Sequence, residues 1–108
     1  MYRRCVLTPF LGRLDQLERL LGQLLPQCPP DTAILLINDG GPADAVEQSL
    51  AQCLESSQVH LLHHESNQGV AAARNTGIAW CRGQGVELLL MVDSDSYNSS
   101  SKRVLNLA

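Results

Sequence analysis

The sequence has no run of apolar residues that approaches the roughly 20 needed to cross a lipid bilayer. It also lacks a secretory signal, because the short apolar run after the first four residues stops at Pro9. The four cysteines are widely spaced and form no Cys-x-x-Cys pair, which argues against a zinc site. We therefore expect a chain without a membrane span, with reduced thiols, located in the cytoplasm.

Basic residues are few as well. The chain has 8 Lys and Arg against 11 Asp and Glu, and the basic residues are scattered. A nucleic-acid-binding surface needs basic residues gathered on one face, so we expect no nucleic-acid partner. Neither a Gly-x-Gly-x-x-Gly loop nor a Walker lysine loop occurs, which weakens the two best-known nucleotide-binding interpretations. What remains is a chain of 108 residues, 44% hydrophobic, long enough for one small core.

Strand-like and helix-like patterns alternate along this chain. Apolar runs typical of strands occur at residues 5–10, 32–37, 58–63 and 86–92. A leucine stripe from Leu14 to Leu25 predicts an amphipathic helix, and Asn67 is a candidate N-cap for a later helix that begins near Val70. Strands that alternate with helices favour parallel pairing through crossovers. We predict an α/β fold, a three-layer α/β/α sandwich around a mostly parallel, Rossmann-like, four-stranded sheet over residues 1–98. The pattern leaves the polar tail, 99–108, unassigned.

Polar side chains follow three of the predicted strands. They are Thr8 and Pro9, Asn38 and Asp39, and Asp93 to Asp95. The carboxyl ends of parallel strands meet at one edge of an open sheet, where ligands bind. There Asp39 can accept hydrogen bonds from a base imide or a ribose hydroxyl, and Arg74 can donate to a carbonyl or a phosphate. Asp93 and Asp95 can hold a hard divalent cation together with phosphate oxygens. The sum predicts a site for a nucleotide diphosphate with a metal.

Three histidines near the third strand suggest a second metal site at first sight. On a strand, His60 and His64 would share one face while His63 points the other way. We therefore favour imidazoles at a strand edge and in a loop over a metal-binding cluster.

Four motifs stand in a defined order: Val6 to Phe10, Ile37 to Gly41, Asn67 to Gly77 and Met91 to Asp95. The third has the pattern Asn-x-Gly-x-x-x-Ala-Arg-Asn-x-Gly and is the most specific of the four. In order and spacing they resemble the N-terminal half of a family 2 glycosyltransferase of the GT-A type. The resemblance covers roughly residues 4 to 95.

The resemblance implies a role for each matching position in a nucleotide pocket. Thr8, Pro9 and Phe10 would line the pocket for the base, usually uracil. Asp39 would bind the base, and Arg74 would support the base or the diphosphate. The implied donor is a UDP-sugar, while the acceptor could be a saccharide, a lipid or a protein.

Asp93 and Asp95 would form the Asp-x-Asp motif of the family. In that role they contact the ribose and coordinate Mg²⁺ or Mn²⁺ on the diphosphate. The metal would act as a Lewis acid and stabilise charge on the departing nucleoside diphosphate.

One departure from the family concerns catalysis. The family's catalytic base and acceptor site lie in a second half beyond the Asp-x-Asp motif, and this sequence ends at Ala108. Transfer with inversion needs a base for the acceptor hydroxyl, and neither Glu65 nor Glu87 is suitably placed. We expect a truncated donor-binding half that binds a nucleotide and is inactive alone. We also expect the strand at 86–92 to lie at a sheet edge, so that the chain forms a homo-oligomer through that edge or through the tail.

Two alternatives differ in class from this hypothesis. A phosphotransferase would carry its Asp-x-Asp on the first strand with a hydroxyl residue two positions later. Here the pair follows the fourth strand, and Tyr97 takes that place. The other alternative is a non-catalytic nucleotide-binding or structural module of GT-A fold.

Overall fold

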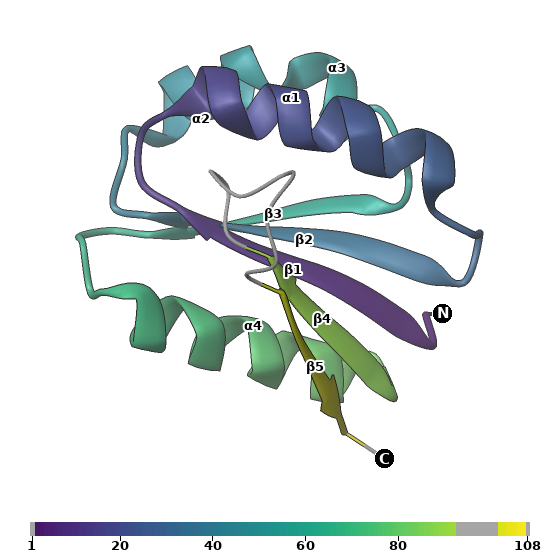
Figure 1. Ribbon diagram of the computed structural model, residues 1–108. Coiled ribbons are helices and arrows are strands. Elements are labelled where there is room, and N and C mark those ends of the chain that lie inside the picture. The colour runs from purple at the N-terminus through teal and green to yellow at the C-terminus, as the bar shows by residue number, and fades with distance from the viewer. Residues whose placement is uncertain (1, 93–101, 108) are drawn as a thin grey trace.

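In the computed structural model, which describes residues 2–92 and 102–107, helices cover both faces of a five-stranded sheet (Figure 1). The strands are β1 (Arg4–Phe10), β2 (Thr32–Asp39), β3 (Val59–His64), β4 (Leu88–Val92) and β5 (Lys102–Asn106). The helices are α1 (Leu14–Leu24), α2 (Ala43–Ser49), α3 (Ala51–Leu54) and α4 (Val70–Gly83), with a 3-10 turn, η1 (Leu25–Gln27), after α1. Helices α1 to α3 lie on one face and α4 on the other, so the predicted three-layer sandwich is confirmed.

The strand order places β1 at the centre of the sheet. The order is β3-β2-β1-β4-β5, and all neighbouring pairs are parallel except β4 and β5. The chain moves outward from β1 to β3 and then returns, so that β4 pairs with the other side of β1. Such a reversal creates a crevice beyond the carboxyl ends of the strands, which is the usual ligand site of open α/β sheets.

The prediction that the strand at 86–92 forms a sheet edge is wrong. β4 lies between β1 and β5, and its Leu90 is opposite Val104 in an antiparallel pair. Leu105 and Leu107 pack against the core on the α4 side, and this burial holds the short strand in place. The tail that the sequence left unassigned therefore supplies the edge strand. Five residues in an otherwise polar region are too short a pattern to predict.

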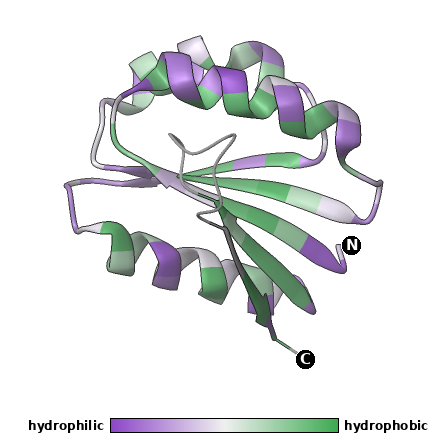
Figure 2. Cartoon of the chain, in the orientation of Figure 1, coloured by the Kyte–Doolittle hydropathy of each residue, from purple (hydrophilic) through white to green (hydrophobic). Residues whose placement is uncertain are grey.

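The core consists of two apolar layers, one on each face of the sheet. All eight residues of β2 are buried, as expected for a central strand that helices cover on both sides. Leu17, Leu20 and Leu21 of the predicted leucine stripe are the buried residues of α1. Figure 2 shows the apolar colour concentrated along the strands, while polar residues alternate with apolar ones on the helices. Within the described ranges, no helix is long and apolar enough to span a membrane.

All four cysteines are free, in agreement with the expected reduced thiols. Cys5 of β1 and Cys81 of α4 are buried together in the core on the α4 side. The neighbouring Cys81 and burial both raise the pKa of the Cys5 thiol, so Cys5 stays protonated at neutral pH.

Helix α4 approaches the sheet closely at Gly77. A methyl group at this position would lie 2.6 Å from Cδ2 of Leu7, which is fully buried in β1. Packed interiors accommodate such overlap only by shifting side chains or backbone. The glycine therefore sets the distance between α4 and β1, and with it the position of the helix at the crevice.

We expect Gly77→Ala to lower the free energy of unfolding by about 1–3 kcal/mol, the usual effect of overpacking a core. Gly83→Ala is the matched control, because it makes the same change in the same helix where nothing lies within 4 Å. Urea denaturation followed by circular dichroism measures both variants. Equal stability of the two variants would contradict the close approach at Gly77.

Candidate functional site

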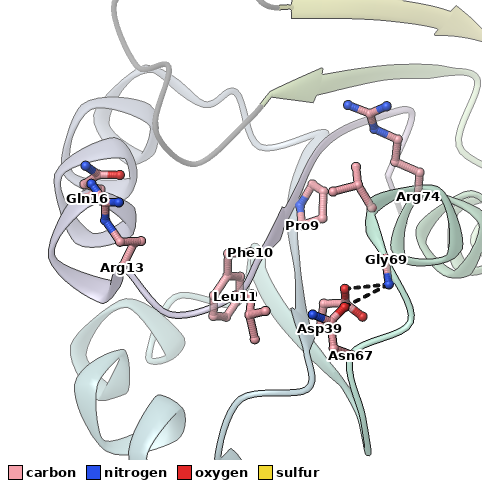
Figure 3. A pocket seen from close by; sticks show the side chains of 10 residues that line it. Pro9, Phe10, Leu11, Arg13, Gln16, Asp39, Asn67, Gly69 and Arg74 are labelled. Atoms are coloured by element: carbon pink, nitrogen blue, oxygen red, sulfur yellow. Dashed lines mark hydrogen bonds between the residues drawn. The ribbon is translucent and has the colours of Figure 1, made fainter.

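A cavity of about 670 Å³ lies at the carboxyl edge of the sheet. Its walls come from the ends of β1 and β2, the start of α1, and the loop and first turns of α4 (Figure 3). The lining residues are Pro9, Phe10, Leu11, Arg13, Gln16, Asp39, Asn67, Gly69, Val70 and Arg74. The cavity occupies the crevice that the strand order predicts, and its size falls within the roughly 300–1,000 Å³ of small-molecule sites.

Asp39 is the carboxylate in the wall of this cavity among the described residues. Its side chain is 7% exposed and makes three hydrogen bonds. Oδ1 accepts from the Nδ1–H of His64 at 2.9 Å and from the backbone N–H of Gln68 at 3.0 Å. Oδ2 accepts from the backbone N–H of Gly69 at 3.0 Å. A carboxylate offers about four acceptor positions. Oδ2 therefore retains capacity for one more hydrogen bond.

These contacts decide the charge of Asp39. Burial alone would raise the pKa of the carboxyl group, but the hydrogen bonds from Gln68, His64 and Gly69 outweigh it. The pKa of Asp39 is therefore lower than its ordinary value of 3.8, and the group is ionised at neutral pH.

The loop before α4 is ordered by Asp39 and by a close backbone contact. Gly40 has φ of +103°, and a methyl group there would come within 2.7 Å of the carbonyl carbon of Ser66. The N-cap of α4 is Gly69, and Asn67 accepts a hydrogen bond from its N–H at 3.0 Å. The prediction of Asn67 as the N-cap is thus wrong by two residues. The buried carboxylate of Asp39 satisfies the N–H groups at the helix entry, which leaves Asn67 a supporting acceptor.

Two arginines and the N-termini of two helices give the cavity a positive character. Arg13 precedes α1 with a left-handed backbone (φ 52°), and Arg74 lies in the second turn of α4. In neither helix does the N-cap residue itself make a side-chain cap hydrogen bond, and the helix dipole is positive at this end. Gln16 adds a buried Oε1 that has no hydrogen-bond partner among the described residues. Together these groups suit an anionic ligand that also carries N–H or O–H donors.

The cavity brings together four of the residues that the sequence predicted: Pro9, Phe10, Asp39 and Arg74. Thr8 does not line it, because its side chain is fully buried in β1, where Oγ1 has no partner within the described ranges.

The Asp-x-Asp pair, Asp93 and Asp95, lies outside the described residues. β4 ends at Val92, and its Met91 is opposite Leu7 of β1, two residues before Pro9 of the cavity wall. Over the ranges 2–92 and 102–107, no group of three His, Cys, Asp or Glu residues could hold a metal ion.

Sequence reasoning missed six residues of the cavity wall: Leu11, Arg13, Gln16, Asn67, Gly69 and Val70. All six lie in or next to the loops that follow β1 and β3. One available signal was position, since loops after parallel strands open onto the same edge as the strand ends. For Asn67, Gly69 and Val70 a second signal was the motif from Asn67 to Gly77.

The histidines follow the predicted alternation of faces and form no cluster. His60 packs against Trp80 of α4, and His64 contacts Asp39 and Thr76 on the same side. His63 points to the opposite side, where its Nε2 lies 3.3 Å from Glu47 of α2. Each imidazole has its own protein partners.

Solved structures share this fold. A mannosyltransferase from Pyrobaculum calidifontis in complex with GDP-Man and Mn²⁺ superposes with a TM-score of 0.72 at 19% identity, covering 86% of this chain and 27% of that one. TarS (residues 1–349) from S. aureus gives the same TM-score at 22% identity, covering 88% of this chain and 28% of that one. The fold is that of the GT-A glycosyltransferases.

Sequence relatives agree with this class. The uncharacterized glycosyltransferase EpsJ of Bacillus subtilis is 31% identical over 96 residues, which are 89% of this chain and 27% of that protein. The polyprenol monophosphomannose synthase of Mycolicibacterium smegmatis is 30% identical over 95 residues, 86% of this chain and 35% of that protein. Residues 5–107 match the family described as Glycosyl transferase family 2, and the chain belongs to it. It spans about a quarter to a third of the length of these relatives.

We expect Asp39→Asn to lower the free energy of unfolding at pH 7 by about 1.5–3 kcal/mol, the usual worth of hydrogen bonds to a charged group. The folded chain holds the pKa of Asp39 below 3.8, so the ionised group stabilises the fold above that pH. This contribution is lost as the pH falls through the folded pKa. Urea unfolding measured from pH 7 to pH 3 should therefore show that the difference in free energy of unfolding between the unaltered chain and Asp39→Asn narrows below pH 3.8. A gap that stays constant would contradict the assignment.

Proposed function

We propose that the chain is the donor-binding part of a glycosyltransferase and binds a nucleotide-diphospho-sugar, with UDP as the nucleotide. The observation that carries the proposal is the cavity at the carboxyl edge, where the ionised Asp39 lies in the wall and Arg13 and Arg74 line the same cavity. Family membership supports the class of reaction. A cytoplasmic location stays a prediction from the sequence.

Hydrogen-bond capacity supports uracil as the base. Oδ2 of Asp39 has one acceptor position left after its bond to Gly69. Uracil presents one N–H on its pairing edge, whereas guanine presents a ring N–H and an amino group side by side. The single remaining acceptor position of Asp39 matches the single N–H of uracil. The apolar Pro9 and Phe10 in the same wall provide surface for a flat ring.

The cationic side of the cavity suits the diphosphate. Arg74 of α4 and Arg13 before α1 present guanidinium groups, which bind phosphate oxygens in forked geometry. The N-terminal turns of both helices line the same cavity and add the positive ends of their dipoles. Charge and shape therefore support a proposal in which the base lies near Asp39 and the phosphates lie toward the arginines.

Asp93 and Asp95 would hold Mg²⁺ or Mn²⁺ on the diphosphate. Two carboxylates that follow β4 are a suitable donor set for a hard divalent cation. When bound, the metal supplies Lewis-acid stabilisation of charge on the leaving nucleoside diphosphate. The chain's own residues bind and orient the donor.

We further propose that this chain binds the donor without transferring its sugar. Deprotonation of an acceptor hydroxyl needs a base whose pKa is near the working pH. Asp39 is the carboxylate in the described cavity wall, and its lowered pKa makes it a weak proton acceptor.

In isothermal titration calorimetry with Mn²⁺, we expect UDP to bind more tightly than GDP by about tenfold, which corresponds to roughly 1.4 kcal/mol. Asp95→Asn should weaken the Mn²⁺-dependent binding of UDP by a similar factor or more. Asp31→Asn is the control, because Asp31 precedes β2 at the opposite edge of the sheet. A folded chain that binds neither nucleotide would contradict the proposal and favour a non-catalytic structural module.

We expect no release of UDP from UDP-glucose, UDP-galactose or UDP-N-acetylglucosamine above the rate measured without protein. The reason is the absence of a suitable base in the described cavity wall. A coupled assay for UDP in the presence of Mn²⁺ and saccharide acceptors measures it. Sustained turnover by the 108-residue chain would show that this part of the proposal is wrong.

A further inference from the structure

A continuous chain of hydrogen bonds runs from the cavity wall into helix α4. Asp39 at the end of β2 accepts from Nδ1 of His64 at the end of β3, at 2.9 Å. Nε2 of His64 lies 2.8 Å from Oγ1 of Thr76 in α4. Oγ1 of Thr76 also lies 3.1 Å from the carbonyl oxygen of Ala72, one turn earlier. Three elements that are distant in the sequence are thus joined through one buried imidazole, whose side chain is 9% exposed.

The charge of Asp39 fixes which ring nitrogen of His64 carries a proton. An ionised carboxylate only accepts hydrogen bonds, so the nitrogen that faces it, Nδ1, must be protonated. The hydroxyl of Thr76 can then form a hydrogen bond with Nε2 whether or not Nε2 carries a proton. It donates to a neutral Nε2, or it accepts from a protonated Nε2 while donating to Ala72. The bond between Nδ1 and Asp39 is preserved in both cases.

The position of Asp39 depends on this bond because its other contacts come from the loop. The remaining two donors are the backbone N–H groups of Gln68 and Gly69. Gln68 is exposed, and Gly69 has φ of +95°. His64 is the one donor of the three that is a side chain on a strand, and Thr76 holds it from a helix that packs on the sheet. The rotamer of Asp39 is therefore set from the interior of the fold.

We propose that His64, supported by Thr76, is the positioning residue that holds Asp39 in the cavity wall with one acceptor position of Oδ2 free for the nucleotide base. The inference deepens the proposed function and depends on it for the identity of the ligand. His64 itself is absent from the cavity lining, so it acts through Asp39.

Two substitutions at position 64 separate the two bonds of the imidazole. The amide nitrogen of asparagine reaches about as far as Nδ1, so His64→Asn keeps a donor for Asp39 and loses the link to Thr76. The longer glutamine reaches toward Nε2, so His64→Gln keeps the link to Thr76 and loses the donor for Asp39. Thr76→Val removes the hydroxyl with little change in shape. His60→Asn is the control, because His60 lies on the same face of β3 but contacts Tyr2 and Trp80.

Calorimetry with UDP and Mn²⁺ tests the effect on binding. We expect His64→Gln to weaken UDP binding at least tenfold and Thr76→Val about threefold, while His64→Asn and His60→Asn stay within about twofold of the unaltered chain. Rescue by asparagine is the decisive result, since a purely structural role would make both substitutions at position 64 equally harmful. Equal loss in both, or no loss in His64→Gln, would overturn the proposal.

Titration of the Asp39 carboxyl carbon by NMR, without nucleotide, gives a second test that does not depend on ligand binding. The pKa of Asp39 should rise in His64→Gln and stay low in His64→Asn, because the imidazole bond is among the contacts that lower it. An unchanged pKa in folded His64→Gln would overturn the positioning role. If the unaltered chain binds neither UDP nor GDP, the proposed function fails, and this titration alone decides whether His64 positions the carboxylate.

Discussion

The structure depends on keeping one carboxylate ionised inside the protein. Burial of an unpaired charge is costly enough that such a group would otherwise become protonated. Asp39 avoids this through three hydrogen bonds, one from β3 and two from the loop that enters α4. The same three bonds fasten the loop to the end of β2. The charge of Asp39, the position of the loop before α4 and the start of α4 therefore depend on the same three hydrogen bonds, and none of them can change without the other two.

The cavity follows from this constraint and from the strand order. Because β4 returns to the far side of β1, the ends of β1 and β2 face an open crevice rather than another connection. Gly77 brings α4 close to Leu7, and Gly40 lets the loop at Ser66 approach the tip of β2. Both glycines are in the family motifs, and each stands where a side chain would push a wall of the crevice outward.

Local pattern was enough to predict the layers, the parallel strands and three residues of the cavity wall, Pro9, Asp39 and Arg74, and the family resemblance added Phe10. The all-buried β2 and the leucine stripe of α1 are periodic signals that a single sequence carries. Contacts between residues that are distant in the sequence have no such periodic signal. Asp39 meets Gln68 and Gly69 some thirty positions later, and β5 pairs with β4 through too few residues to predict. The alternation of His60, His63 and His64 was predictable, whereas the bond from His64 to Asp39 required the register of β2 and β3.

The hydrogen bonds that suit Asp39 to the proposed recognition of a nucleotide base make it unsuitable for proton transfer. A base must bind a proton during the reaction, and the lowered pKa of Asp39 measures how strongly this fold opposes that step. Selection among nucleobases instead requires a fixed, ionised acceptor. An acceptor whose position and charge do not change binds one pattern of N–H donors better than others. In relatives that are about two and a half to three times as long, binding and chemistry need not share a residue. In the proposed function the described part of this chain serves the first of the two, and the physical reason is the hydrogen bonding of Asp39.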